Sequence, residues 1–199
     1  MFKKNIGFYS IEVTMKVGFI QFDVKHNQQE NINSIEEYLK TLNCDIVVLP
    51  ELCLCGYLFD SKEVLSLVAE EVPYGEGTKK MAALSEKYNC TLIFGLAEKS
   101  EKNIYNTAVV VSKGKYVGKY RKIHLSDFEK GFFERGNGNK VFDLGFCKIG
   151  VQICFDLWFP EISREQILQG AHLFCVLANF GGETSASIAA TRATENLTP

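Results

Sequence analysis

Residues 148–161 read KIGVQICFDLWFPE, an apolar run that stops at Cys154 and gives way to a second segment containing Pro160. An apolar, glycine-containing run of this length predicts a buried strand, and proline is common in the first turn of a helix. The pattern therefore predicts a strand, a sharp turn and a helix, which hold the thiol out for attack. Backbone N–H groups left unpaired after the cysteine would face the same space and could hold a developing oxyanion.

An arbitrary free cysteine at a strand end is more often a small buried hydrophobic residue, so Cys154 needs further support. Two more polar sites follow apolar runs. Glu51 comes directly after residues 45–49 and Pro50, and Lys122 ends the strand-like run 116–121. Each is weak alone, because lysine after a strand is usually solvated. Together they form a usable set: a carboxylate to move the thiol proton and an ammonium to hold the oxyanion.

Five ordered segments resemble the nitrilase superfamily of carbon–nitrogen hydrolases. They are KVGFIQF at 16–22, LPEL at 49–52 followed by Gly56-Tyr57, YRKIHL at 120–125, CFDLWFPE at 154–161 and RATEN at 192–196. The resemblance implies an α/β fold, an α-β-β-α sandwich with mixed sheets, and a thioester mechanism. It also implies that Glu51, Lys122 and Cys154 are the catalytic residues.

Many members of that superfamily carry a second glutamate shortly after the lysine. Glu129 is the nearest candidate here, and Glu134 is the alternative. The mechanism we expect has Cys154 attack an amide carbonyl while Glu51 serves as base and then as acid. Lys122 and the backbone N–H of Phe155 hold the oxyanion, and no cofactor or metal is needed.

We favour a small amide or carbamoyl substrate over a nitrile, because amidases and carbamoylases outnumber true nitrilases among the relatives. An alternative reaction at the same site is acyl transfer, in which an amine replaces water as the acceptor. An alternative from another functional class is a binding or scaffold protein that keeps the fold but has no catalytic activity. Intact Glu51, Lys122 and Cys154 argue against the silent alternative.

Composition is typical of one soluble globular domain, with 199 residues, 46% hydrophobic and 23% charged. A net charge of -2 does not indicate a protein that binds nucleic acid or an anionic membrane surface. Seven cysteines, an odd number, favour reduced thiols and a cytoplasmic location over a disulfide framework. Cys53 and Cys55 have no further histidine or cysteine cluster at zinc spacing, so metal binding is not expected.

The two ends of the chain need separate interpretation. Residues 1–14 mix polar residues into the apolar run and contain no secretory signal, so we interpret them as an extension or as a sign of an alternative start at Met15. Residues 15–199 form the predicted hydrolase domain. Because members of the superfamily continue past the RATEN-like segment, we expect that the C-terminal part of this domain is missing. The resemblance implies a homodimer or larger homo-oligomer, and exposed sheet edges predict self-association.

Periodicity predicts alternating strands and helices, followed by hairpins and then further alternation. The predicted strands are 16–22, 45–49, 91–97, 106–112, 116–121, 140–143, 146–153 and 172–177, and the predicted helices are 28–42, 62–70, 77–88, 160–169 and 185–196. We interpret His124 as a hydrogen-bonding structural histidine, and Asp156 as a residue that caps or holds the turn. Phe132, Phe133 and Trp158 line either the substrate pocket or the core.

Overall fold

A computed structural model of the protein describes residues 15–179 and 183–199. The predicted extension at 1–14 lies outside the described residues. The strands are β1 (Val17–Phe19), β2 (Ile46–Val48), β3 (Thr91–Ser100), β4 (Asn103–Ser112), β5 (Lys115–Arg121), β6 (Val141–Asp143), β7 (Lys148–Ile153) and β8 (Leu173–Leu177). The helices are α1 (Gln28–Leu39), α2 (Lys62–Val68), α3 (Glu76–Lys87), α4 (Pro160–Leu168) and α5 (Glu183–Asn196), with 3-10 turns η1 (Glu129–Gly131) and η2 (Cys154–Trp158).

Both sheets are mixed. The larger has the order β1-β2-β3-β4-β5, with β1, β2 and β3 parallel and with β3, β4 and β5 antiparallel. The smaller has the order β6-β7-β8, in which β7 is antiparallel to β6 and parallel to β8. Parallel pairs need long crossovers whereas antiparallel pairs need only tight turns, which matches the predicted mixture of helices and hairpins.

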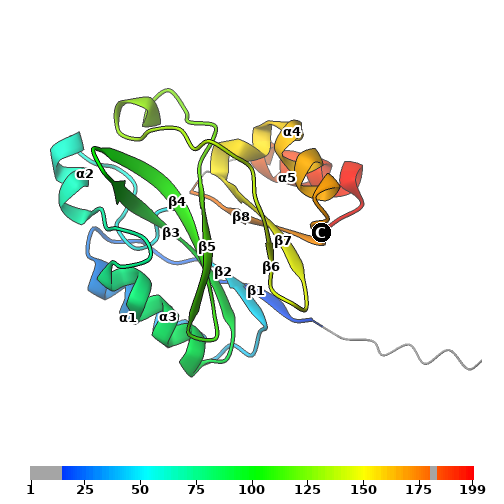
Figure 1. Ribbon diagram of the computed structural model, residues 1–199, viewed down its shortest axis with the longest axis horizontal. Coiled ribbons are helices and arrows are strands. Elements are labelled where there is room, and N and C mark those ends of the chain that lie inside the picture. The colour runs from blue at the N-terminus through cyan, green and yellow to red at the C-terminus, as the bar shows by residue number, and fades with distance from the viewer. Residues whose placement is uncertain (1–14, 180–182) are drawn as a thin grey trace, which may run out of the picture.

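The elements form four layers, helix, sheet, sheet and helix (Figure 1). Helices α1 and α3 cover the outer face of the larger sheet, where Ile35, Met81 and Phe94 are fully buried in one cluster. Helices α4 and α5 lie on the side of the smaller sheet (Figure 1). Between the sheets, apolar side chains such as Val110 and Val151 form a second cluster. The α-β-β-α architecture follows from burying both faces of each sheet.

Local sequence explains where the covering helices begin. The side chain of Asn27 accepts a hydrogen bond from the backbone N–H of Glu30 at the start of α1, and Ser61 does the same for Val64 at α2. At α3, the Glu70 carboxylate instead accepts the backbone N–H groups of Gly77 and Thr78. These acceptors satisfy N–H groups that the first helical turn leaves unpaired.

Several observed strand bounds differ from the predicted ones. The shifts are largest at β1, β3 and β4, and β4 begins three residues before its predicted start at Asn106. β1 spans three residues instead of the predicted seven, because it pairs with β2 only over Val17–Phe19. β3 continues three residues beyond its predicted end at Ala97. Glu98, the charged residue just past that predicted end, is buried and accepts hydrogen bonds from Thr107 and Arg121 at 2.8 and 2.9 Å. None of the described helices is both long enough and apolar enough to cross a membrane.

Candidate active site

Cys154 stands where β7 ends and the 3-10 turn η2 begins. Its φ angle is +47°, a left-handed conformation that costs energy for a residue with a side chain. The predicted strand and turn are therefore present, although the first segment after the cysteine is a 3-10 turn and α4 starts only at Pro160. The Cys154 side chain belongs to the apolar cluster between the sheets, and the residue is 7% exposed.

Glu51 lies in the turn that follows β2, and this turn packs directly on β3. The backbone N–H of Leu49 donates to Ile93, and that of Leu54 donates to Gly95. A Cβ atom on Gly95 would lie 2.3 Å from the backbone N of Leu52, so the close approach needs glycine. Glu51 is thereby fixed over the centre of the larger sheet, and its side chain is buried.

Lys122 directly follows β5, and its backbone is held on both sides. Its N–H donates to the carbonyl of Asn106 on β4 at 2.9 Å, and its carbonyl accepts the N–H of Gly136 at 2.8 Å. A Cβ atom on Gly136 would lie 2.1 Å from the Arg121 carbonyl oxygen, so only glycine permits this crossing. The Lys122 side chain points inward and is fully buried.

The buried Lys122 ammonium joins two carboxylates. Its Nζ lies 2.7 Å from Oε1 of Glu51 and 2.7 and 2.9 Å from the two oxygens of Glu129. The Asn106 amide donates to both glutamates, at 2.8 and 3.0 Å. The backbone N–H of Asn179, which follows β8, donates to the other oxygen of Glu51 at 3.2 Å. Residues from five places in the chain thus converge on one buried charge cluster.

The structure places Glu129, and not Glu134, against Lys122. Glu129 opens the 3-10 turn η1, and one of its oxygens accepts both the backbone N–H and the hydroxyl of Ser126 at 2.9 Å. Glu134 has a half-exposed side chain that faces Lys62 at 3.7 Å. Of the two glutamates that the sequence offered, Glu129 therefore has the geometry to support Lys122.

One cation between two carboxylates sets the pKa values of the cluster. Burial raises the pKa of Glu51, although the ammonium of Lys122 opposes this. Burial also acts to raise the pKa of Glu129, but Lys122 and Ser126 outweigh it and hold that pKa below its ordinary value. Burial acts to lower the pKa of Lys122, and the two carboxylates reverse that effect and raise it. Lys122 and Glu129 thus form the charged pair, while Glu51 is the carboxylate that binds a proton more readily.

The Cys154 thiol lies within the electrostatic field of this cluster. Burial raises the pKa of Cys154 to about 12, and the negative charge of Glu51 adds to the rise while Lys122 opposes it. At neutral pH the thiol therefore keeps its proton and needs a base to become a nucleophile. Burial also raises the pKa of Tyr57, and the charges of Glu51 and Glu129 raise it further.

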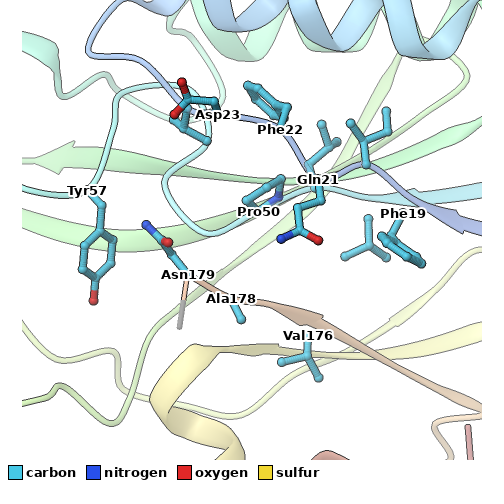
Figure 2. Close-up of a pocket in the computed structure, with 13 residues that line it drawn as sticks. Phe19, Gln21, Phe22, Asp23, Pro50, Tyr57, Val176, Ala178 and Asn179 are labelled. Carbon is cyan, nitrogen blue, oxygen red and sulfur yellow. The ribbon is translucent and has the colours of Figure 1, made fainter. Parts of the chain in front are cut away.

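A pocket of about 480 Å³ adjoins the Glu51 turn. Tyr57 and Asn179 lie at one end of it, and Phe19 and Val176 lie at the other (Figure 2). Pro50, which precedes Glu51, also lines the wall. The pocket therefore runs from the neighbourhood of the charge cluster to the outer edges of β1 and β8.

The remaining residues singled out in the sequence take supporting positions. His124 stacks on Phe159, with ring centroids 3.7 Å apart and planes at 9°. Its backbone N–H donates to Asp156 at 2.9 Å, consistent with the structural interpretation. Phe133 is buried in a core cluster and Phe132 packs against that cluster, whereas Trp158 is partly exposed. Across residues 15–179 and 183–199, no group of three or more His, Cys, Asp and Glu side chains is arranged to hold a metal ion.

Sequence reasoning missed Asn106 and Ser126. Asn106 is a fully buried amide on β4, and it donates to both glutamates. The signal that points to it is a polar Asn106-Thr107 pair at the start of a run of apolar residues. Ser126 lies three residues before Glu129, a spacing that lets a side-chain oxygen and a backbone N–H meet one carboxylate.

The sequence profile of the carbon–nitrogen hydrolase family matches residues 13–199. The chain belongs to this family. It is 40% identical over 170 residues to a nitrilase of Pyrococcus abyssi, covering 83% of this chain and 65% of that protein. It is 30% identical over 178 residues to the N-carbamoylputrescine amidase of Arabidopsis thaliana, covering 84% of this chain and 59% of that protein. This member of the carbon–nitrogen hydrolase family thus spans about two thirds or less of the length of these relatives.

The fold agrees with solved structures of the same superfamily. An amidase from Nesterenkonia superposes with a TM-score of 0.78 at 20% identity, over 92% of this chain and 73% of that one. At that identity the likeness concerns the fold. The predicted α-β-β-α sandwich with mixed sheets is confirmed.

Proposed function

We propose that this carbon–nitrogen hydrolase family member cleaves the C–N bond of a small amide or carbamoyl compound through a thioester on Cys154. The observation that most supports the proposal is the buried contact of Lys122 with Glu51 and Glu129, in the same electrostatic environment as the thiol. Burying charge is costly, so a purely structural role gives little reason to place this cluster beside a cysteine.

In the first half-reaction the sulfur of Cys154 attacks the carbonyl carbon while Glu51 takes the thiol proton. A C–S bond forms, and the carbonyl π electrons move to oxygen. Lys122 and the backbone N–H of Phe155 stabilise that oxyanion. When the intermediate collapses, the C–N bond breaks and Glu51 returns the proton to the departing ammonia or amine.

In the second half-reaction water attacks the thioester carbonyl and Glu51 accepts a proton from it. The C–S bond then breaks, the carboxylic acid leaves, and the sulfur regains its proton. The same residue therefore acts twice as base and twice as acid. A carboxyl group suits this task best when its pKa is raised towards the working pH.

The pKa directions favour Glu51 over Glu129 as that base. Burial raises the pKa of Glu51, which makes it the better proton acceptor. Glu129 has a lowered pKa, since Lys122 and Ser126 stabilise its charged form. We assign Glu129 the role of holding Lys122 in place and keeping it charged.

The names of two relatives support different substrates. One is an N-carbamoylputrescine amidase at 30% identity, which favours amide and carbamoyl compounds. The other is a nitrilase at 40% identity, which favours nitrile hydrolysis as a second candidate. In that case Cys154 would attack the nitrile carbon to give a thioimidate, and water would then release ammonia and leave the thioester.

Ammonia release from a panel of primary amides, N-carbamoyl amines and nitriles tests the proposal. Wild-type protein is compared with Cys154→Ala and with Cys147→Ala, a matched variant that removes another buried thiol. We expect release from amides or carbamoyl compounds by wild type and Cys147→Ala, and none by Cys154→Ala. Release from nitriles alone would select the second candidate. No turnover of any compound by folded wild type would contradict both and favour a catalytically silent role.

A further inference from the structure

One buried carboxylate, Asp156, contacts the two chain segments that carry Lys122 and Cys154. Its Oδ2 accepts the backbone N–H of Ile153 at 3.1 Å and the hydroxyl of Tyr120 at 2.8 Å. Its Oδ1 accepts the backbone N–H of His124 at 2.9 Å and lies 3.1 Å from Nδ1 of the same residue. The Asp156 side chain is fully buried.

These partners flank the site in sequence. Ile153 immediately precedes Cys154, and Tyr120 and His124 lie two residues before and two residues after Lys122. The cysteine follows a strand of the smaller sheet, and the lysine follows a strand of the larger sheet. Asp156 therefore ties the two sheets together at the point where thiol and ammonium must meet.

We propose that Asp156 is a positioning residue that fixes the distance between Lys122 and Cys154. This inference rests on the proposed function for the roles of those two residues. A cap for η2 alone would need only the Ile153 contact, yet half of the hydrogen-bonding capacity of Asp156 is directed to His124. A displacement of about 1 Å between reacting groups costs on the order of 10²-fold in rate.

The chemistry of the side chain explains why a carboxylate is needed. An ionised carboxylate only accepts hydrogen bonds, whereas an amide has one accepting oxygen and one donating NH₂ group. In an Asp156→Asn variant the NH₂ group faces either the Ile153 pair or the His124 pair. In either orientation the backbone N–H of Ile153 or that of His124 faces the NH₂ group and loses its acceptor. The link between the Cys154 segment and the Lys122 segment is then broken at one of its two ends.

Two variants provide matched controls for Asp156→Asn. Glu70→Gln alters another carboxylate with four hydrogen bonds, which come from two backbone N–H groups and from the side chains of Thr78 and Gln28, at the start of α3. Tyr120→Phe removes one side-chain contact of Asp156 and leaves both backbone contacts. The three variants are compared for kcat, KM, thermal unfolding and the rate at which iodoacetamide modifies Cys154.

We expect Asp156→Asn to lower kcat on the order of 10²-fold with little change in KM, and to slow alkylation of Cys154. Glu70→Gln should lose thermal stability but keep wild-type kcat and alkylation rate. Tyr120→Phe keeps both backbone contacts of Asp156, so its losses in kcat and alkylation rate should be smaller than those of Asp156→Asn. If Asp156→Asn does not fold, Asp156→Glu keeps the acceptor but displaces it by one methylene, and it should show the same two losses. A folded variant at position 156 with wild-type kcat and alkylation rate would overturn the inference.

The alkylation rate separates this inference from the proposed function. If wild-type protein hydrolyses nothing in the panel, the proposed function fails, but the rate of modification at Cys154 still reports the geometry around the thiol. A selective loss of that rate in Asp156→Asn would support the positioning role even then. An unchanged rate would contradict it whatever the outcome for turnover.

Discussion

The Nζ atom of Lys122 lies 2.7 Å from Oε1 of Glu51, and both side chains are fully buried. A buried ion pair is weak evidence for stability, because desolvation offsets most of the attraction. Here the single cation also faces Glu129 at 2.7 Å. We therefore expect the fold to depend on Lys122, while burial raises the pKa of Glu51 against the opposing effect of the ammonium.

Lys122→Ala should destabilise the protein by about 3–5 kcal/mol, because it leaves two buried carboxylates without their cation. The free energy of unfolding in urea measures this. Lys130→Ala is the matched control, since Lys130 pairs with exposed Asp127 and an exposed pair contributes little. Equal stability of the two variants would show that Lys122 is not what holds the cluster together.

Glu129→Gln should lower kcat, because Lys122 loses the carboxylate that contacts it through both oxygens. Glu134→Gln is the matched control, as it changes a half-exposed glutamate five residues away. We expect Glu134→Gln to keep wild-type kcat. Steady-state kinetics on the best amide of the panel compares them, and a larger effect from Glu134→Gln would reverse the assignment.

The acid side of the pH profile should report Glu51. The base must be ionised to act, and burial raises its pKa, so kcat/KM should fall as pH decreases through a value above that of an ordinary glutamate. Asn106→Ala removes a hydrogen bond that lowers this pKa, so the fall should begin at a still higher pH. Glu51→Gln should cost ~10²–10⁴-fold in rate. An acid limb that Asn106→Ala leaves unmoved would argue against Glu51 as the titrating base.

Self-association through the outer edge of β1 is also expected. Phe19 on this strand is 77% exposed, and β1 pairs only with β2 among the described strands. An exposed apolar edge invites contact with another chain. Light scattering should give a molar mass above that of one chain, and Phe19→Lys should lower it. A molar mass equal to that of one chain for the wild type would refute this expectation.

Much of the site was predictable because its residues lie at strand ends, which local patterns reveal. Strand-like runs that stop at Cys154, before Glu51 and before Lys122 place all three residues at strand ends, and the family resemblance implies their roles. The exact partners were not predictable from such patterns, because they depend on contacts between distant segments. Asn106 lies 55 residues from Glu51 in sequence, and only the pairing of β4 with β3 and β5 brings it to the cluster.

In the fold, too, local patterns predict some features, and contacts between distant segments determine the others. The covering helices and the hairpins follow from periodicity and turn residues, whereas the bounds of β1 and β3 differ from the predicted ones for tertiary reasons. Charged residues are rarely buried, so Glu98 would not be expected inside a covered strand. Its burial depends on Thr107 and Arg121, which lie nine and 23 residues away and reach it through the pairing of β3, β4 and β5. Likewise, the three residues that contact Asp156 lie in or beside strands of two sheets whose association no local pattern specifies.

The covalent intermediate provides the most direct measurement of the central claim. Wild-type protein is mixed with the best amide of the panel, quenched in acid during turnover and digested, and each cysteine-containing peptide is weighed by mass spectrometry. We predict an added acyl group on the peptide that contains Cys154, with none on the peptides of the other six cysteines and none in Cys154→Ala. Undiminished ammonia release by folded Cys154→Ala, without any acylated peptide in wild type, would contradict the account.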